Sequence, residues 1–115
     1  MTENAAGRVF VFRCDGCLDG NGASPEEIVE HGMRQGARYF IIDATNAAYL
    51  DSPGIRWLLR LKTLIKNLGR DLRIVARSKG PVERNLLMLQ VDIPRFETLA
   101  AAWRAPWEAT HKRAV

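Results

Sequence analysis

Two short segments of the 115-residue chain contain residue types that are able to do chemistry. The first is Cys14-Asp15-Gly16-Cys17, a spacing found in thiol-redox pairs and in half of a zinc site. A zinc site needs further ligands, but His31 and His111 lie far away without ligand spacing, and a glycine-rich loop replaces the helix start that a redox pair requires. We therefore expect structural cysteines. A thiol-redox or metal protein that uses Cys14 and Cys17 remains the alternative from another class.

The second segment is Asp51-Ser52-Pro53-Gly54, which places a hydroxyl beside a carboxylate at a predicted helix start. Serine is a favoured N-cap residue and proline suits the first helical position. The pattern therefore predicts that Ser52 caps the helix and that Pro53 begins it. As a cap alone, Ser52 contributes about 1 kcal/mol to the helix.

The helix after this segment is predicted from Gly54 to about Leu68, ending before Gly69. One side of it is apolar and consists of Trp57, Leu58, Leu61, Leu64, Ile65 and Leu68. At the margin of that side, Ile55 and Leu59 lie beside Lys62 and Lys66. This mixed stripe predicts a partner surface, unless Ile55 and Leu59 simply pack under a neighbouring loop.

The remaining segments alternate between strand and helix patterns. Ser24 with Glu27 predicts a capping box for a helix that ends at about Gln35, and Gly16 to Gly22 predicts a loop. Leu86 and Leu89 are expected to face inward from a helix over about 82–90. Strands are predicted at 8–13, 38–43, 72–76 and, very short, within 93–97; a last helix follows Thr98. This order predicts an α/β fold with a mostly parallel sheet of about four strands and about four helices. In such a fold the loops from strands to helices, including Asp51-Ser52, meet at one edge of the sheet.

Composition indicates one domain over residues 1–115. Apolar residues make up 47% and charged residues 26% of a 12.9 kDa chain, which is typical of a globular protein. Residues 1–7 are expected to be a loose N-terminus, and 104–115 a helix end or tail. No run approaches the ~18 apolar residues of a membrane span and no secretory pattern is present, so we expect a cytoplasmic protein without membrane insertion.

The charge and the motifs limit the function classes. The net charge is +4, but the basic residues are spread from Arg8 to Arg113 without a like-charge run, so we expect no nucleic-acid partner. The sequence contains no Ser-His-Asp order, Gly-rich phosphate loop or paired catalytic carboxylates. We therefore expect neither an enzyme nor a cofactor.

Three blocks of this sequence resemble the STAS domain family, which includes the bacterial anti-sigma factor antagonists. Gly16-Cys17-Leu18-Asp19 is similar to the family's Gly-Glu-Leu-Asp, with Cys17 in place of Glu. Residues 49–55, with Asp51-Ser52-Pro53-Gly54, resemble its Asp-Ser-Ser/Thr-Gly-Leu signature, with Pro53 at the second hydroxyl position. Residues 78–93 resemble its later block, and the likeness extends over about residues 8–103. Family members usually have two strands before the first block, so residues 2–7 are either a poor strand or lack one.

The resemblance implies a phosphorylation-controlled binding module in transcription regulation. The residue that matches the phosphorylated serine is Ser52, and the expected partner is an anti-sigma factor that is also a serine kinase. The unphosphorylated domain would bind this partner and the phosphorylated domain would release it. The expected partner-binding residues are Asp51, Ile55, Arg56, Leu59, Lys62 and Lys66. Alternatives within the family are a subunit of a stressosome or of a lipid-transport complex without a phosphoswitch.

Overall fold

The computed structural model describes residues 8–105 and contains a parallel sheet with helices on both faces. Its strands are β1 (Val9–Arg13), β3 (Tyr39–Asp43), β5 (Asp71–Val75) and β6 (Arg95–Phe96), in the order β1-β3-β5-β6. All neighbouring strands are parallel, with Val9 opposite Tyr39 and Tyr39 opposite Asp71. The predicted α/β class and mostly parallel four-strand sheet are confirmed.

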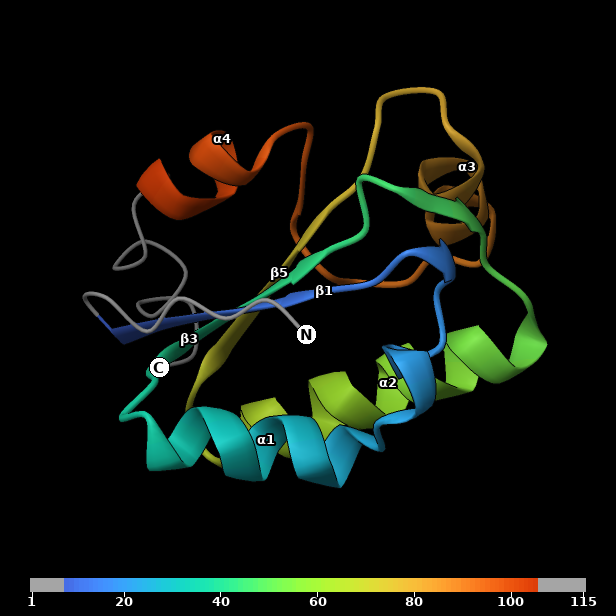
Figure 1. The fold of residues 1–115 in the computed structure, drawn as a ribbon. Coiled ribbons are helices and arrows are strands. Elements are labelled where there is room, and N and C mark those ends of the chain that lie inside the picture. The colour runs from blue at the N-terminus through green and yellow to red at the C-terminus, as the bar shows by residue number, and fades with distance from the viewer. Residues whose placement is uncertain (1–7, 106–115) are drawn as a thin grey trace.

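The four helices divide between the two faces of this sheet. α1 (Pro25–Arg34) and α2 (Ser52–Asn67) lie side by side beneath it, and α4 (Leu99–Arg104) lies above (Figure 1). α3 (Pro81–Met88) contributes Val82 and Leu86 to the same core as α1 and α2. A smaller core on the opposite face joins Val11 and Ile41 of the sheet to Ala102 of α4. Both faces are therefore covered, as the continuous apolar run in β3 requires.

A second, two-stranded sheet was missed by the sequence reasoning. β2 (Gly16–Cys17) pairs in parallel with β4 (Ala47–Tyr49), and a 3₁₀ turn, η2 (Gly20–Gly22), follows it. The sequence predicted only a loop over Gly16 to Gly22. Strands this short have no readable alternation, and they form because two distant segments are held side by side.

Two helix bounds also differ from the predictions. α2 begins at Ser52 and not at Gly54, and α3 ends at Met88 and not near Gln90. Leu89, expected to face inward, is 50% exposed, and Leu68 is 44% exposed. Each of these leucines is the C-cap residue of its helix, where the apolar periodicity no longer sets the direction of the side chain.

Arg73 is a buried charge that connects β5 to α4. Its guanidinium donates to the carbonyl oxygens of Ala102 (2.6 Å) and Ala105 (2.9 Å) and lies 5.0 Å from the centre of the Phe96 ring. These bonds satisfy carbonyl groups that the end of a helix leaves without a partner. Arg73 thus fixes the helix that covers the second face of the sheet.

Within residues 8–105, no helix has the length and apolar character that crossing a membrane requires. The expectation about a first strand in residues 2–7 concerns residues outside the described part of the chain. The expected tail lies largely outside it as well.

Candidate functional site at the start of α2

The first turn of α2 is capped by Asp51. Its carboxylate accepts a hydrogen bond from the Gly54 backbone N–H at 3.0 Å, and its carbonyl accepts from the Ile55 N–H at 2.9 Å. The prediction that Ser52 is the N-cap is therefore wrong, because a carboxylate one residue earlier already reaches the donor that an N-cap serves. Ser52 is the first residue of the helix and Pro53 the second.

The Ser52 side chain is exposed at this corner. In the part of the chain that the structure describes, its hydroxyl makes no hydrogen bond, because Asp51 has taken over capping. The hydroxyl is therefore accessible to a second protein, and its loss or modification leaves the cap intact.

Gly54 allows α2 to begin in close contact with the loop after β2. A Cβ atom at this position would lie 2.2 Å from the Leu18 carbonyl oxygen and 2.9 Å from a methyl carbon of Leu50. Backbone oxygen cannot yield as a flexible side chain does, so only glycine fits. Packing thus explains the glycine in the Asp51-Ser52-Pro53-Gly54 segment: without a side chain at Gly54, the start of α2 packs directly against Leu18.

Two hydrogen bonds from other elements hold the corner in place. The Leu18 N–H donates to the Tyr49 carbonyl at 3.1 Å, which extends the β2–β4 pairing. The Asn85 side chain of α3 donates to the Leu50 carbonyl at 2.8 Å. Sequence reasoning missed Asn85, although an amide directly before the buried Leu86 of this helix indicates a side chain that satisfies a buried backbone group.

Trp57 anchors the second turn of α2 to the loop before α1. Its indole N–H donates to the Ala23 carbonyl at 2.8 Å. A Cβ atom at Gly20 would lie 2.4 Å from that indole nitrogen, so Gly20 has to be small as well. Ser52 is therefore presented on a rigid support.

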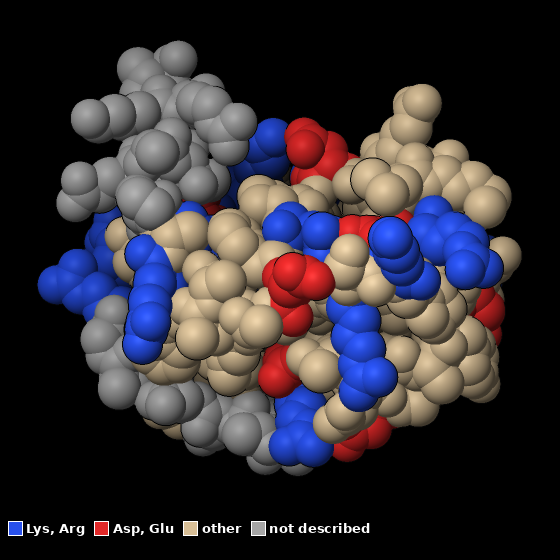
Figure 2. Space-filling view, turned by 90° about the horizontal axis from the view of Figure 1, so that it is seen from above, with Lys and Arg blue, Asp and Glu red and all other residues tan. Residues whose placement is uncertain are grey.

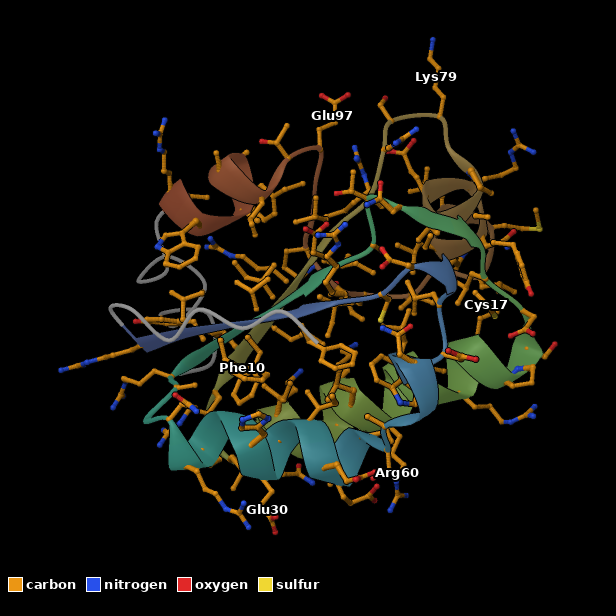
Figure 3. All side chains as sticks on the ribbon, in the orientation of Figure 1. Phe10, Cys17, Glu30, Arg60, Lys79 and Glu97 are labelled. Atoms are coloured by element: carbon orange, nitrogen blue, oxygen red, sulfur yellow. The ribbon has the colours of Figure 1, made fainter. Side chains whose placement is uncertain are left out.

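Neither cysteine has the electrostatic environment of a redox thiol. Cys14 is fully buried, and burial raises the pKa of its thiol to about 12. Desolvation, followed by the negative charge of Asp51, also raises the pKa of Cys17, which lies opposite Tyr49 and on the side of the molecule where α2 begins (Figure 3). Reactive and metal-binding thiols need a lowered pKa, so both shifts oppose the redox alternative.

Residues 8–105 contain no group of three or more His, Cys, Asp or Glu side chains placed to hold a metal ion. His31 lies in α1 with its ring 5.3 Å from that of Phe10, away from the cysteine segment along the chain. His111 is outside the described residues.

The stripe predicted along α2 divides into packed and outward residues. Ile55 is half-buried and packs against the core, and Lys62 is half-buried. Leu59 is 42% exposed, and Arg56 and Lys66 are exposed. The alternative in which both apolar residues pack inward therefore applies to Ile55 and not to Leu59.

The sequence model of the STAS domain matches residues 3–102, which include all three blocks and the corner. The chain belongs to the STAS domain family.

A solved structure has the same fold. The STAS domain described here is similar to the anti-sigma factor antagonist SpoIIAA in its unphosphorylated form, with a TM-score of 0.52 and 19% sequence identity. The similarity covers 93% of this chain and 89% of that one. No curated protein sequence is similar enough to count as a match.

Proposed function

We propose that this STAS domain is a regulatory binding module whose partner is an anti-sigma factor with serine kinase activity, and that phosphorylation of Ser52 by this partner ends binding. The observation that carries the proposal is the exposed Ser52 hydroxyl, relieved of capping by Asp51. The domain acts through binding and not as an enzyme, in the bacterial cytoplasm. The similarity to an antagonist solved in its unphosphorylated form supports this function.

The local donors leave a phosphate on Ser52 facing outward. A phosphate adds about −1.5 to −2 charges at neutral pH, and a helix start normally offers backbone N–H groups to such an anion. Here the Gly54 N–H is bonded to Asp51, and Pro53 has no N–H. Two of the backbone groups that normally receive an anion are thus already bonded or missing, so less of the phosphate charge is offset at the helix start and more of it meets an approaching partner.

The basic residue best placed to meet that phosphate is Arg56, four positions after Ser52 on the same helix. An acid and a base at this spacing are neighbours on a helix surface. A phosphate on Ser52 thus adds negative charge and also reduces the positive charge that Arg56 offers to a partner. Both effects weaken binding if the partner presents acidic side chains.

The proposed contact surface consists of six residues around and after the corner. They are Asp51, Ile55, Arg56, Leu59, Lys62 and Lys66. Replacing both Lys62 and Lys66 by Glu is expected to weaken partner capture, because it reverses the charge beside Leu59 without changing the core.

Phosphorylation is tested first on the protein recovered from its native cells. We expect a phosphate-sized mass increment that fragmentation localises to Ser52. Ser24 is an internal control, because its hydroxyl accepts the Glu27 N–H at 3.1 Å and belongs to a capping box. A phosphate found at Ser24 and not at Ser52 would contradict the proposal.

Partner capture then tests the switch itself. The wild type and Ser52→Ala are expected to capture the kinase partner equally, and Ser52→Asp to lose it. Ser78→Asp is the matched control, since it adds the same charge at an exposed serine in the β5–α3 loop. Equal capture by all variants would leave a STAS binding module without a phosphoswitch.

A further inference from the structure

Residues 8–105 expose six large apolar side chains. These are Tyr49, Leu59, Leu68, Leu87, Met88 and Leu89, with exposed fractions from 42% to 70%. Isolated exposed leucines are ordinary, whereas a group on one side of the molecule indicates a contact surface. These six side chains form a contact surface only where several of them lie on the same side of the molecule.

Arg60 and Ser52 mark two different sides of α2. Arg60 forms a salt bridge with Glu26 of α1, which identifies the flank that faces α1 (Figure 3). Leu59 precedes Arg60 by one residue, a rotation of about 100°, and follows Ser52 by seven residues, or about two turns. Leu59 therefore belongs to the ridge that starts at Ser52 and lies on the side away from α1.

On α3, Asn85 identifies the flank that faces the corner. Its side chain donates to the Leu50 carbonyl, and α3 lies beside β4 (Figure 1). Met88 follows Asn85 by three residues and thus shares its flank, whereas Leu87 follows by two and points to another side; the exposed Leu89 is the C-cap residue directly after Met88. Leu59 thus lies on the Ser52 ridge of α2, and Met88 lies on the flank of α3 that is bonded to Leu50, two residues before Ser52.

The charge exposed on these two helices is positive. α2 contains Arg56, Arg60, Lys62 and Lys66 and no acidic residue. On α3, Arg84 is exposed, while Glu83 is buried, pairs with Arg95 at 2.6 Å and accepts the Lys79 N–H at 2.6 Å. By contrast, acidic and basic side chains are interspersed on the face over α4 and the β5–α3 loop (Figure 2).

We propose that the flanks of α2 and α3 beside Ser52 form a docking surface for an acidic amphipathic helix of the partner protein. Its apolar side chains would cover Leu59, Met88 and Leu89, and its carboxylates would face Arg56, Lys66 and Arg84. Apolar anchors beside mostly basic side chains are suited to an acidic helix, and the one carboxylate at the corner, Asp51, is engaged as the cap of α2. This inference rests on the proposed binding function, and it gives the sign of the switch: a phosphate on Ser52 repels an acidic helix.

A synthetic peptide tests this surface without any natural partner. The probe is a helical peptide of about five turns with leucines on one side and glutamates along both margins. Binding to the full chain is followed through backbone amide NMR shifts at low salt. We expect shifts in the first half of α2 and the end of α3, and an affinity that falls as salt rises.

Matched leucine variants locate the contact. Leu59→Ser and Met88→Ser are each expected to reduce affinity about tenfold, as for a central apolar anchor. Leu68→Ser and Leu87→Ser are the controls: Leu68 is 44% exposed against 42% for Leu59, and Leu87 is 70% exposed against 68% for Met88. We expect both controls to stay within about twofold of the wild type.

Several outcomes would overturn the docking surface. The first is that a peptide with lysine in place of glutamate binds as tightly as the acidic peptide, and the second is that the NMR shifts are confined to other elements. The third is that the control leucine variants reduce affinity as much as Leu59→Ser and Met88→Ser. The fourth is tighter binding to phosphatidylserine vesicles or single-stranded DNA than to the acidic peptide. The result is separable from the phosphoswitch. Peptide binding at α2 and α3 without any phosphate on Ser52 in cells would support the docking surface and contradict the phosphoswitch. A phosphate on Ser52 without peptide binding would support the phosphoswitch and contradict the docking surface.

Discussion

The starts of α1 and α2 have the same Ser-Pro dipeptide and use it differently. In Ser24-Pro25, the serine is the N-cap: its hydroxyl accepts the Glu27 N–H, and the Glu27 carboxylate accepts the Ser24 N–H at 2.9 Å. In Ser52-Pro53, the serine is one residue inside the helix and Asp51 is the cap. One serine is thus part of the helix structure, and the other is left for a partner.

The role of each serine follows from the residue before it and from the residue two positions after it. Ala23 precedes Ser24 and cannot cap, whereas Asp51 precedes Ser52 and can. Two positions after the serines, α1 has the exposed Glu26 and α2 has Gly54 against the Leu18 carbonyl. The α2 corner is therefore closely packed at Gly54 on its inner side, while Asp51, Ser52 and Pro53 are exposed on its outer side.

The largest effect is expected from Gly54→Ala. Its methyl group would overlap the Leu18 carbonyl oxygen, so we expect a loss of about 1–3 kcal/mol in the free energy of unfolding, measured by chemical denaturation. Glu26→Ala, at the equivalent position of α1, is the control and should cost clearly less because that side chain is exposed. Equal costs for the two variants would show that the α2 corner is not packed as described.

Ser24→Ala is expected to cost about 1 kcal/mol, because it removes the cap of α1 and leaves a backbone N–H without its partner. Asp51→Ala should cost a similar amount or less at α2. Denaturation midpoints of the two variants provide the comparison. A stable Ser24→Ala protein would contradict the structural role of this serine.

A double-mutant cycle sharpens the contrast at α2. Without the Asp51 carboxylate, the helix is free to begin one residue later, with Ser52 as its cap and Pro53 in the first position. Ser52→Ala is then expected to cost about 0.5 kcal/mol more in the Asp51→Ala background than in the wild type. Additive costs would mean that Ser52 has no latent capping role.

The smallest effect is expected from Ser52→Ala alone. Its hydroxyl has no hydrogen bond in the described part of the chain, so the free energy of unfolding should change by less than about 0.5 kcal/mol. The same denaturation experiment measures it. A decrease in the free energy of unfolding as large as that of Ser24→Ala would show that both serines stabilise a helix start.

Much of this fold follows from local patterns that are visible in the sequence. The apolar run at Tyr39 to Ile42 predicts a strand covered on both sides, and Ser24 with Glu27 predicts a capped helix start, and both are present. The family and the corner segment were also recognisable, because Asp51, Ser52 and Gly54 are adjacent in the chain.

The positions set by contacts between distant residues had to come from tertiary structure. β2 and β4 form only because two segments distant in the sequence pair with each other. Leu89 is exposed because α3 ends at Met88, so Leu89 lies just beyond the helix. Local sequence patterns were enough to predict the main strands and helices and to place Ser52 at the start of a helix. The contacts of Gly54 with the Leu18 carbonyl and of the Asn85 side chain with the Leu50 carbonyl were visible only in the folded chain, because packing between distant segments leaves no periodic signal in a sequence.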